Sequence, residues 1–164
     1  MPDFIYPYPP LLPGILLKRY KRFFVDVELV TGEVVVAHCP NTGPMTGVCT
    51  PGNQVYVSES DNPDRKLRYT LEMIAVQDNQ PTWAGVNTSL PNRVIRQALI
   101  EKVIPELGDY SQIRHEVPYG SDRKSRIDFL LTGDTTAKPI YIEVKNTTWV
   151  QEDLALFPDT VTTR

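Results

Sequence analysis

The chain has 164 residues, of which 41% are hydrophobic and 23% charged, and its net charge is −3 at pH 7. This length suits one ordinary domain or two small ones, and the acidic balance excludes a uniformly basic, histone-like protein. Fifteen prolines and nine glycines, spread widely, indicate many turns and short strands rather than long helices.

The first thirteen residues contain five prolines and lack the basic start and apolar stretch of a signal peptide. No apolar run approaches the roughly 20 residues of a membrane span. Cys39 and Cys49 are too few for a disulfide scaffold, and a metal site made of His38 and these two cysteines lacks a fourth ligand at a diagnostic spacing. We therefore expect a cytoplasmic protein with reduced thiols.

The first half of the chain alternates between apolar and polar residues in short segments, which is the pattern of β-strands. The alternating segments after Gly14 are Phe24–Val30, Glu33–Ala37, Gln54–Glu59, 67–77 and Trp83–Val86. Five or six short strands in about 75 residues predict a small closed barrel, of which the OB-fold is a common type that binds oligonucleotides.

Between two of these strands, residues 39–52 (CPNTGPMTGVCTPG) consist almost entirely of turn-forming residues. Such a loop exposes backbone N–H groups, as anion-binding loops do, although it lacks the G-K-[ST] ending of a P-loop. A tight structural crossover is the alternative interpretation.

Apolar residues recur at helical spacing from Leu90 to Val103. Ser89 is placed to cap this helix, Pro91 lies in its first turn and Pro105 ends it. Its outer face carries Arg93, Arg96 and Lys102. One strand in YSQIRHEV and two more in a hairpin follow, which predicts the order α-β-β-β.

The hairpin joins SRIDFLL to IYIEVKN. If Leu131 and Ile140 close it, Asp128 lies opposite Glu143 with Cβ atoms about 5 Å apart. Lys145 shares the face of Glu143, because side chains two residues apart on a strand point the same way. The sequence therefore predicts that two carboxylates and a lysine converge.

Two like charges this close are costly unless a cation neutralises them, and Mg²⁺ or Mn²⁺ with oxygen ligands is our expectation for Asp128 and Glu143. Such an ion activates water and stabilises charge on a phosphodiester, with Lys145 placed to assist. The alternative is an amphipathic hairpin whose charged side chains only face water.

Ten of the seventeen lysines and arginines fall in three clusters, which we expect to contact nucleic acid: Lys18, Arg19, Lys21 and Arg22; Arg65, Lys66 and Arg68; Arg123, Lys124 and Arg126. Local basic patches attract phosphate even when the net charge is negative. Solvated strand ends and loop tips are the alternative. Five aromatic residues close to these clusters could stack on bases or belong to the core: Tyr20, Phe23, Phe24, Tyr56 and Tyr69.

Seven runs, in order, make the chain similar to the sugar fermentation stimulation protein A family: KRYKRF, AHCPNTGPMTG, SDNPDRKLRYT, GVNTSLPNR, SRIDFLL, YIEVKN and LFPDTVTTR. The resemblance implies a prokaryotic protein that binds DNA without sequence preference and regulates genes of maltose metabolism. It also implies an α+β fold, with an OB-like β-barrel over residues 1–86 and a nuclease-like domain over residues 87–164.

The D-x(n)-E-x-K arrangement resembles that of the PD-(D/E)xK nucleases, which assigns catalytic positions to Asp128, Glu143 and Lys145 and metal binding to the two acids. Glu101 is a further candidate, since many of these nucleases use a Glu from the first helix. That core continues with another helix and strand, so we expect the C-terminal domain to be truncated. Three functions compete: a DNA-binding regulator, a metal-dependent nuclease acting on DNA or RNA, and sugar binding by the turn-rich loop.

Overall fold

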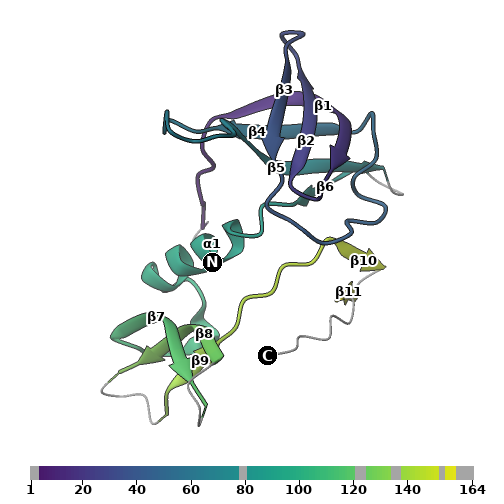
Figure 1. Ribbon diagram of the computed structural model, residues 1–164. Coiled ribbons are helices and arrows are strands. Elements are labelled where there is room, and N and C mark those ends of the chain that lie inside the picture. Colours follow the sequence, from purple (N-terminus) through teal and green to yellow (C-terminus); the bar gives the residue numbers. More distant parts are fainter. Residues whose placement is uncertain (1–3, 78–80, 121–124, 134–137, 152–153, 158–164) are drawn as a thin grey trace. The chain divides into compact units, whose positions relative to one another are not determined.

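The computed structural model describes residues 4–77, 81–120, 125–133, 138–151 and 154–157 (Figure 1). The chain divides into two compact units. One contains residues 8–88 and 146–164, and the other contains residues 1–7 and 89–145. Each unit is described separately below.

The first unit is a closed barrel, visible in Figure 1 as the purple to teal strands. Its strands are β1 (Leu11–Tyr20), β2 (Phe24–Leu29), β3 (Val34–His38), β4 (Gln54–Glu59), β5 (Tyr69–Gln77) and β6 (Pro81–Gly85). They follow the order β3-β2-β1-β4-β5-β6, and a short parallel pairing of β3 with β5 closes the cylinder. The five strands β1 to β5 therefore form the barrel that the sequence predicts, with β6 added beside β5.

The alternating sequence explains which side chains fill the barrel. On β2, Val25, Val27 and Leu29 are buried, whereas Asp26 and Glu28 point outward. Most of the largest fully buried side chains of the cluster come from four strands: Leu16, Val25, Val27, Val55, Val57, Leu71 and Ile74. All five predicted segments match observed strands, with β6 beginning two residues earlier than expected.

A bulge in β5 lies at Glu72, whose side chain is buried. Tyr56 pairs with Met73 and Val57 with Leu71, so Glu72 has no partner on β4. Its carboxylate accepts hydrogen bonds from Ser58 Oγ (2.7 Å) and Asn87 Nδ2 (2.8 Å), and its side chain is only 3% exposed. This buried carboxylate thus fastens the segment that follows β6 to the barrel.

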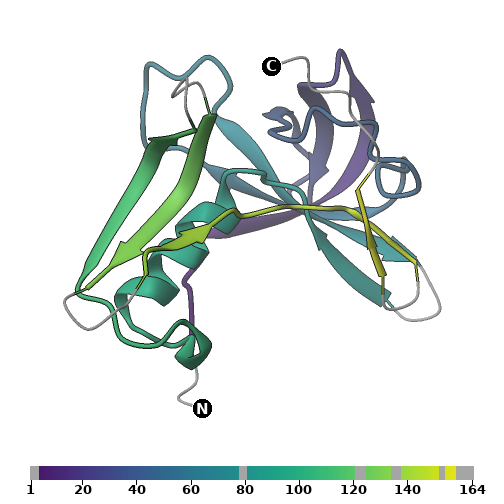
Figure 2. The same ribbon diagram turned by 90° about the horizontal axis from the view of Figure 1, so that it is seen from below.

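The second unit packs one helix against a three-stranded antiparallel sheet (Figure 2). Its elements are α1 (Leu90–Ile100), the 3-10 turn Pro105–Leu107, β7 (Gln112–Tyr119), β8 (Ser125–Thr132) and β9 (Ile140–Ile142), with the sheet in the order β7-β8-β9. Leu99, Tyr110, Phe129 and Leu131 form the buried centre of this unit. The predicted order α-β-β-β is confirmed.

The helix ends three residues before the predicted Val103. Lys102 adopts a left-handed backbone (φ 52°), and the N–H groups of Lys102 and Val103 bond to the carbonyls of Leu99 (3.3 Å) and Ala98 (3.1 Å). These are the two bonds of a Schellman motif, in which glycine is the usual left-handed residue. At the other end, Ser89 occupies the N-cap as predicted, although its side chain makes no capping hydrogen bond.

A small hairpin, β10 (Trp149–Gln151) and β11 (Leu154–Leu156), was not predicted. Strands of three residues are too short to carry a clear alternation signal. The hydroxyl of Thr147 donates to the carbonyl of Leu156 (2.7 Å) and braces the pair.

Across the described ranges, no helix has the length and apolar character that crossing a membrane requires.

Candidate nucleic-acid interface and carboxylate hairpin

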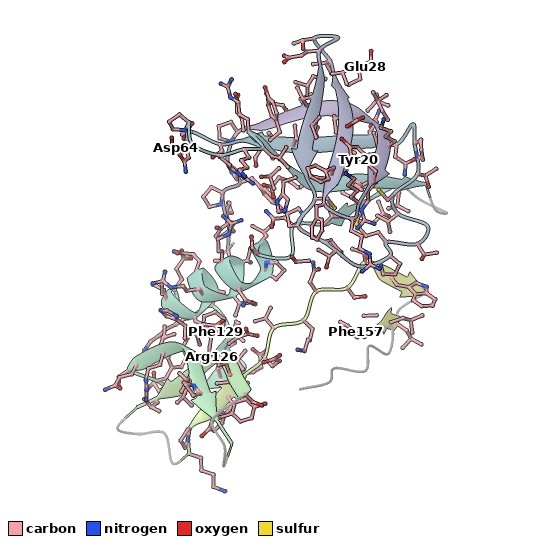
Figure 3. All side chains as sticks on the ribbon, in the orientation of Figure 1. Tyr20, Glu28, Asp64, Arg126, Phe129 and Phe157 are labelled. Carbon is pink, nitrogen blue, oxygen red and sulfur yellow. The ribbon has the colours of Figure 1, made fainter. Side chains whose placement is uncertain are left out.

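The hairpin of β8 and β9 has the predicted register. Leu131 pairs with Ile140, and Phe129 pairs with Ile142, as the alternating apolar residues require. The ladder stops at Ile142, and two residues further on the backbone amide of Val144 donates to Asp128 Oδ2 (2.7 Å). Figure 3 labels Phe129 and Arg126, two residues of β8 that lie on either side of Asp128 in the sequence.

The half-buried carboxylate of Asp128 has a second donor on the helix. Asn92 Nδ2 donates to Asp128 Oδ1 at 3.0 Å, so both carboxylate oxygens are engaged. Asn92 lies in the first turn of α1, and its contact with Asp128, like that of the Val144 amide, was missed by the sequence analysis. No specific signal identifies it, since a polar residue is common near a helix start.

Glu143 is exposed and forms an ion pair with Lys145 Nζ. The two carboxylates therefore have different partners: a lysine pairs with Glu143, and two neutral donors bond to Asp128. Glu101 is not part of this group. It caps the C-terminal end of α1 and accepts a bond from Gln97, nine residues or about 14 Å along the helix from Asn92.

Within the described part of the chain, no three His, Cys, Asp or Glu side chains gather into a metal-binding group. The hairpin thus offers two acidic ligands. Carboxylates are hard oxygen donors, and each oxygen has a second lone pair beyond its present hydrogen bond. This donor type fits a hard divalent cation that completes its coordination with carbonyls and water.

Arg19 of the first basic cluster is committed to the loop that follows β3. Its guanidinium donates to the carbonyls of Asn41 (2.8 Å), Gly43 (2.9 Å), Pro44 (3.3 Å) and Arg22 (3.0 Å). Carbonyls rather than N–H groups therefore converge within residues 39–52. This arrangement supports the structural-crossover interpretation of the loop over the anion-binding one.

The other cations of the first basic cluster are more available to bind a ligand than Arg19 is. Lys18 pairs with Asp26 (3.2 Å) and lies 5.3 Å from the centre of the Tyr20 ring. Lys21 and Arg22 form the exposed turn between β1 and β2, and both have positive φ angles, 49° and 65°. This turn therefore presents two cations on a backbone conformation that ordinarily favours glycine or asparagine.

The second and third basic clusters likewise contain cations that bond to other groups of the protein and cations that are exposed. Arg65 donates to Thr70 Oγ1 (2.7 Å), Arg68 pairs with Glu59, and Lys66 is exposed. In the third cluster, the exposed Arg126 donates to the Glu116 carbonyl (2.8 Å). Arg123 and Lys124 lie outside the described residues.

A row of side chains crosses four strands of the barrel between the first two clusters. Tyr20 is the cross-strand partner of Phe24, Phe24 is that of His38, and His38 is that of Thr70. The hydroxyl of Thr70 accepts a hydrogen bond from Arg65. The rings of Tyr20 and Phe24 stack with centroids 5.4 Å apart. Burial and the nearby Arg65 lower the pKa of His38. We call Tyr20, Phe24, His38 and Arg65 the cross-strand row; Figure 3 labels Tyr20 on β1, and Asp64 in the loop that also carries Arg65.

The other aromatic residues near the basic clusters have different roles. Phe23 is exposed beside Arg22, whereas Tyr69 packs partly buried against the barrel core. Tyr56 contacts Trp83 with ring centroids 4.8 Å apart. The five aromatic residues thus do not form one surface: two stack on each other, one is exposed, and two pack against the barrel core or against Trp83.

Comparisons with known proteins agree with this architecture. Residues 17–86 match the family described as "SfsA N-terminal OB domain", and residues 89–164 match "Sugar fermentation stimulation protein RE domain". The sugar fermentation stimulation protein homologs of Trichormus variabilis and Nostoc punctiforme are each 66% identical over 164 residues, which is all of this chain and 68% of theirs. The chain belongs to the sugar fermentation stimulation protein family.

A solved structure of this family has the same fold. Pyrococcus furiosus SfsA, determined in complex with Ca²⁺, aligns with a TM-score of 0.75 at 26% identity, over 94% of this chain and 62% of that one. The predicted fold class, an OB-like barrel followed by a helix and sheet, is therefore confirmed. The chain spans less than two thirds of that archaeal relative.

Proposed function

We propose that this family member binds DNA without sequence preference through the outer face of its barrel. The observation that carries the proposal is the cross-strand row, which has Lys21 and Arg22 beyond one end and Lys66 beside the other. In OB-folds the face of strands 2 and 3, with the β1–β2 and β4–β5 loops, is the usual oligonucleotide site. The exposed basic residues here fall on those two loops.

The backbone of the β1–β2 turn supports this proposal. A left-handed conformation costs a residue with a side chain about 1–2 kcal/mol, and Lys21 and Arg22 both adopt it. Such strain is often found where function requires a particular side chain. Two cations at the tip of a turn have little packing role, so phosphate binding is the function that best explains their presence.

The test compares two variants that lose the same charge. Lys21→Gly with Arg22→Gly keeps the turn conformation, and Arg93→Gln with Arg96→Gln serves as the control on the exposed face of α1. Fluorescence anisotropy with labelled DNA should show weaker binding and a smaller dependence of affinity on salt only for the turn variant, since each lost phosphate contact lowers the slope by about 0.7–0.9. Equal losses in both variants would mean that only net charge matters.

A second candidate function is metal-dependent phosphodiester cleavage at Asp128, Glu143 and Lys145. Its support is the oxygen-rich hairpin together with the Ca²⁺ complex of the archaeal relative. In this proposal the two carboxylates hold Mg²⁺ or Mn²⁺. The ion would supply an activated water and charge stabilisation. Asn92 and the Val144 amide orient Asp128, and Lys145 is free to leave Glu143 and stabilise negative charge on the phosphate.

This candidate is tested by incubating the protein with plasmid and single-stranded DNA in Mg²⁺, Mn²⁺ or chelator. Lys145→Ala should remove cleavage while calorimetry still detects metal binding, whereas Glu143→Gln should remove both. Glu106→Gln, which removes an exposed acid from the 3-10 turn, is the control and should retain both. Cleavage that survives in chelator would exclude the metal-dependent reaction.

Two further proposals rest on the family resemblance and composition rather than on the site. Regulation of maltose-metabolism genes would follow from DNA binding if the bound regions include their promoters. A cytoplasmic location agrees with the two free cysteines. Mapping bound DNA in cells tests the first, and fractionation tests the second.

A further inference from the structure

The loop from Cys39 to Asn53 brings together three sulfur-containing side chains that neither proposed function uses. Cys39 and Met45 are buried, at 0% and 4% exposure, and Cys49 packs partly exposed against the same cluster. The sulfur atoms of Cys39 and Met45 lie 3.8 Å apart. The backbone N–H of Cys49 donates to the Met45 carbonyl (3.3 Å), which ties Cys49 to the same loop.

Met45 occupies its position at a cost to the backbone. Its φ is 50°, a left-handed value that is uncommon for a long side chain. The loop has glycine at Gly47, where a left-handed conformation (φ 76°) carries no such cost. The conformation of Met45 instead directs a thioether into the barrel beside a thiol. Strain of this kind is a reason to look for a function.

The charges around the thiols are also arranged for a cation. Burial raises the pKa of both Cys39 and Cys49 above its usual value, and the Arg19 guanidinium offsets only part of this rise. The two thiols also interact with each other, since Cys39 raises the pKa of Cys49. Two thiolates with one monovalent cation carry a net charge of −1, and Arg19 supplies the matching positive charge.

We propose that Cys39, Met45 and Cys49 form a three-coordinate, all-sulfur site for a soft monovalent metal ion of the Cu⁺ class. Three sulfur ligands at about 2.3 Å from a metal in a trigonal plane are separated by about 4 Å, close to the observed spacing of the first two. Thiolate and thioether ligands select Cu⁺. Structural Zn²⁺ needs four ligands, and across the described ranges no third His, Cys, Asp or Glu joins the two cysteines. The partly exposed Cys49 provides the entry path.

The experiment uses the full chain, reduced and free of oxygen. Cu⁺ binding is measured by competition with a chromophoric chelator, and Ag⁺ serves as a redox-inert probe in calorimetry. We expect one ion per chain, with release of the thiol protons on binding. Met45→Leu, which preserves volume, should weaken binding at least tenfold, and Cys39→Ser or Cys49→Ser should abolish it. Met73→Leu, which changes a methionine on β5, should have no effect.

Several results would overturn the proposal. Binding that is as tight in Met45→Leu as in the original chain would leave a site of two thiols without the thioether. Tighter binding of Zn²⁺ than of Cu⁺ would contradict the ligand class. Conversion of Cys39 and Cys49 to a disulfide on addition of the ion would replace a binding site by a redox reaction. If the cysteine variants do not fold, Met45→Leu against Met73→Leu still decides the question.

Discussion

Glu72 carries a buried carboxylate that is satisfied by neutral groups. Ser58 and Asn87 each donate to one of its oxygens. Burying polar groups without partners is costly, whereas replacing an ion by a neutral group with the same hydrogen bonds is often neutral. The two bonds, rather than the charge, should therefore determine what this residue contributes to stability.

Accordingly, Glu72→Gln should change the free energy of unfolding by less than about 1 kcal/mol. The new amide group can donate to the Ser58 hydroxyl, which also accepts hydrogen bonds, while its oxygen still accepts from Asn87. Glu72→Ala removes the acceptor of both hydrogen bonds and should cost about 1–3 kcal/mol for each of them. Urea unfolding of both variants is the measurement. Equal destabilisation would show that the negative charge itself is needed.

At the same scale, the sequence predicted some of the site residues well and others poorly. The register of β8 against β9, with Leu131 opposite Ile140, was predictable from the apolar residues of the two strands. The hydrogen bonds from Arg19 to the loop carbonyls were not predictable, because residues 41–44 are distant in sequence and carry no charge that would attract a guanidinium. Counting cations finds clusters, but only the fold shows which members are free.

Strand β1 depends on a glycine for its close approach to β2. A Cβ atom at Gly14 would lie 2.6 Å from Val27 Cγ1 and 2.7 Å from the Glu28 carbonyl oxygen. The backbone oxygen has little freedom to move, since β2 is paired on both sides. The contact explains why this position on β1 has no side chain.

We therefore expect Gly14→Ala to lower the free energy of unfolding by about 2–3 kcal/mol. Gly85→Ala on β6 is the matched control, since a Cβ there would meet nothing within 4 Å, and it should leave stability unchanged or raise it by up to about 1 kcal/mol. Thermal and urea unfolding measure both. A Gly14→Ala variant as stable as its control would mean that the two strands separate at little cost.

Element ends were less predictable than element positions. Pro105 is the residue that the sequence predicts to end the helix, yet Lys102 adopts the left-handed conformation three residues earlier. Glycine would have signalled this end, and lysine does not. The hairpin of β10 and β11 was missed because each strand has only three residues.

For the whole molecule, we propose that the barrel folds without the rest of the chain. Its core shares no residue with that of the second unit, and our proposed boundary lies after residue 86. Two contacts just beyond it belong to the barrel: Asn87 donates to Glu72, and Thr88 Oγ1 donates to the Pro40 carbonyl (3.2 Å). A fragment of residues 1–88 should therefore give dispersed amide signals by NMR.

A fragment of residues 1–86 is the natural comparison. It lacks Asn87 and should unfold at a lower urea concentration, because one oxygen of the buried Glu72 carboxylate loses its donor. Collapsed spectra from both fragments would mean that the barrel needs part of residues 89–164 in order to fold.

The pairing of β3 with β5 also affects how the barrel forms and opens. It consists of two residue pairs, Ala37 with Tyr69 and His38 with Thr70, which are 32 residues apart in the chain. Contacts between distant residues carry the cost of closing a long loop and tend to form late. A seam of two pairs is also the easiest to break, so its amides should exchange hydrogen with solvent through a partial opening of the barrel. The stacked tyrosine and phenylalanine lie on one side of this seam and Arg65 on the other. A strand of DNA laid across it would bind only the closed cylinder and slow that exchange.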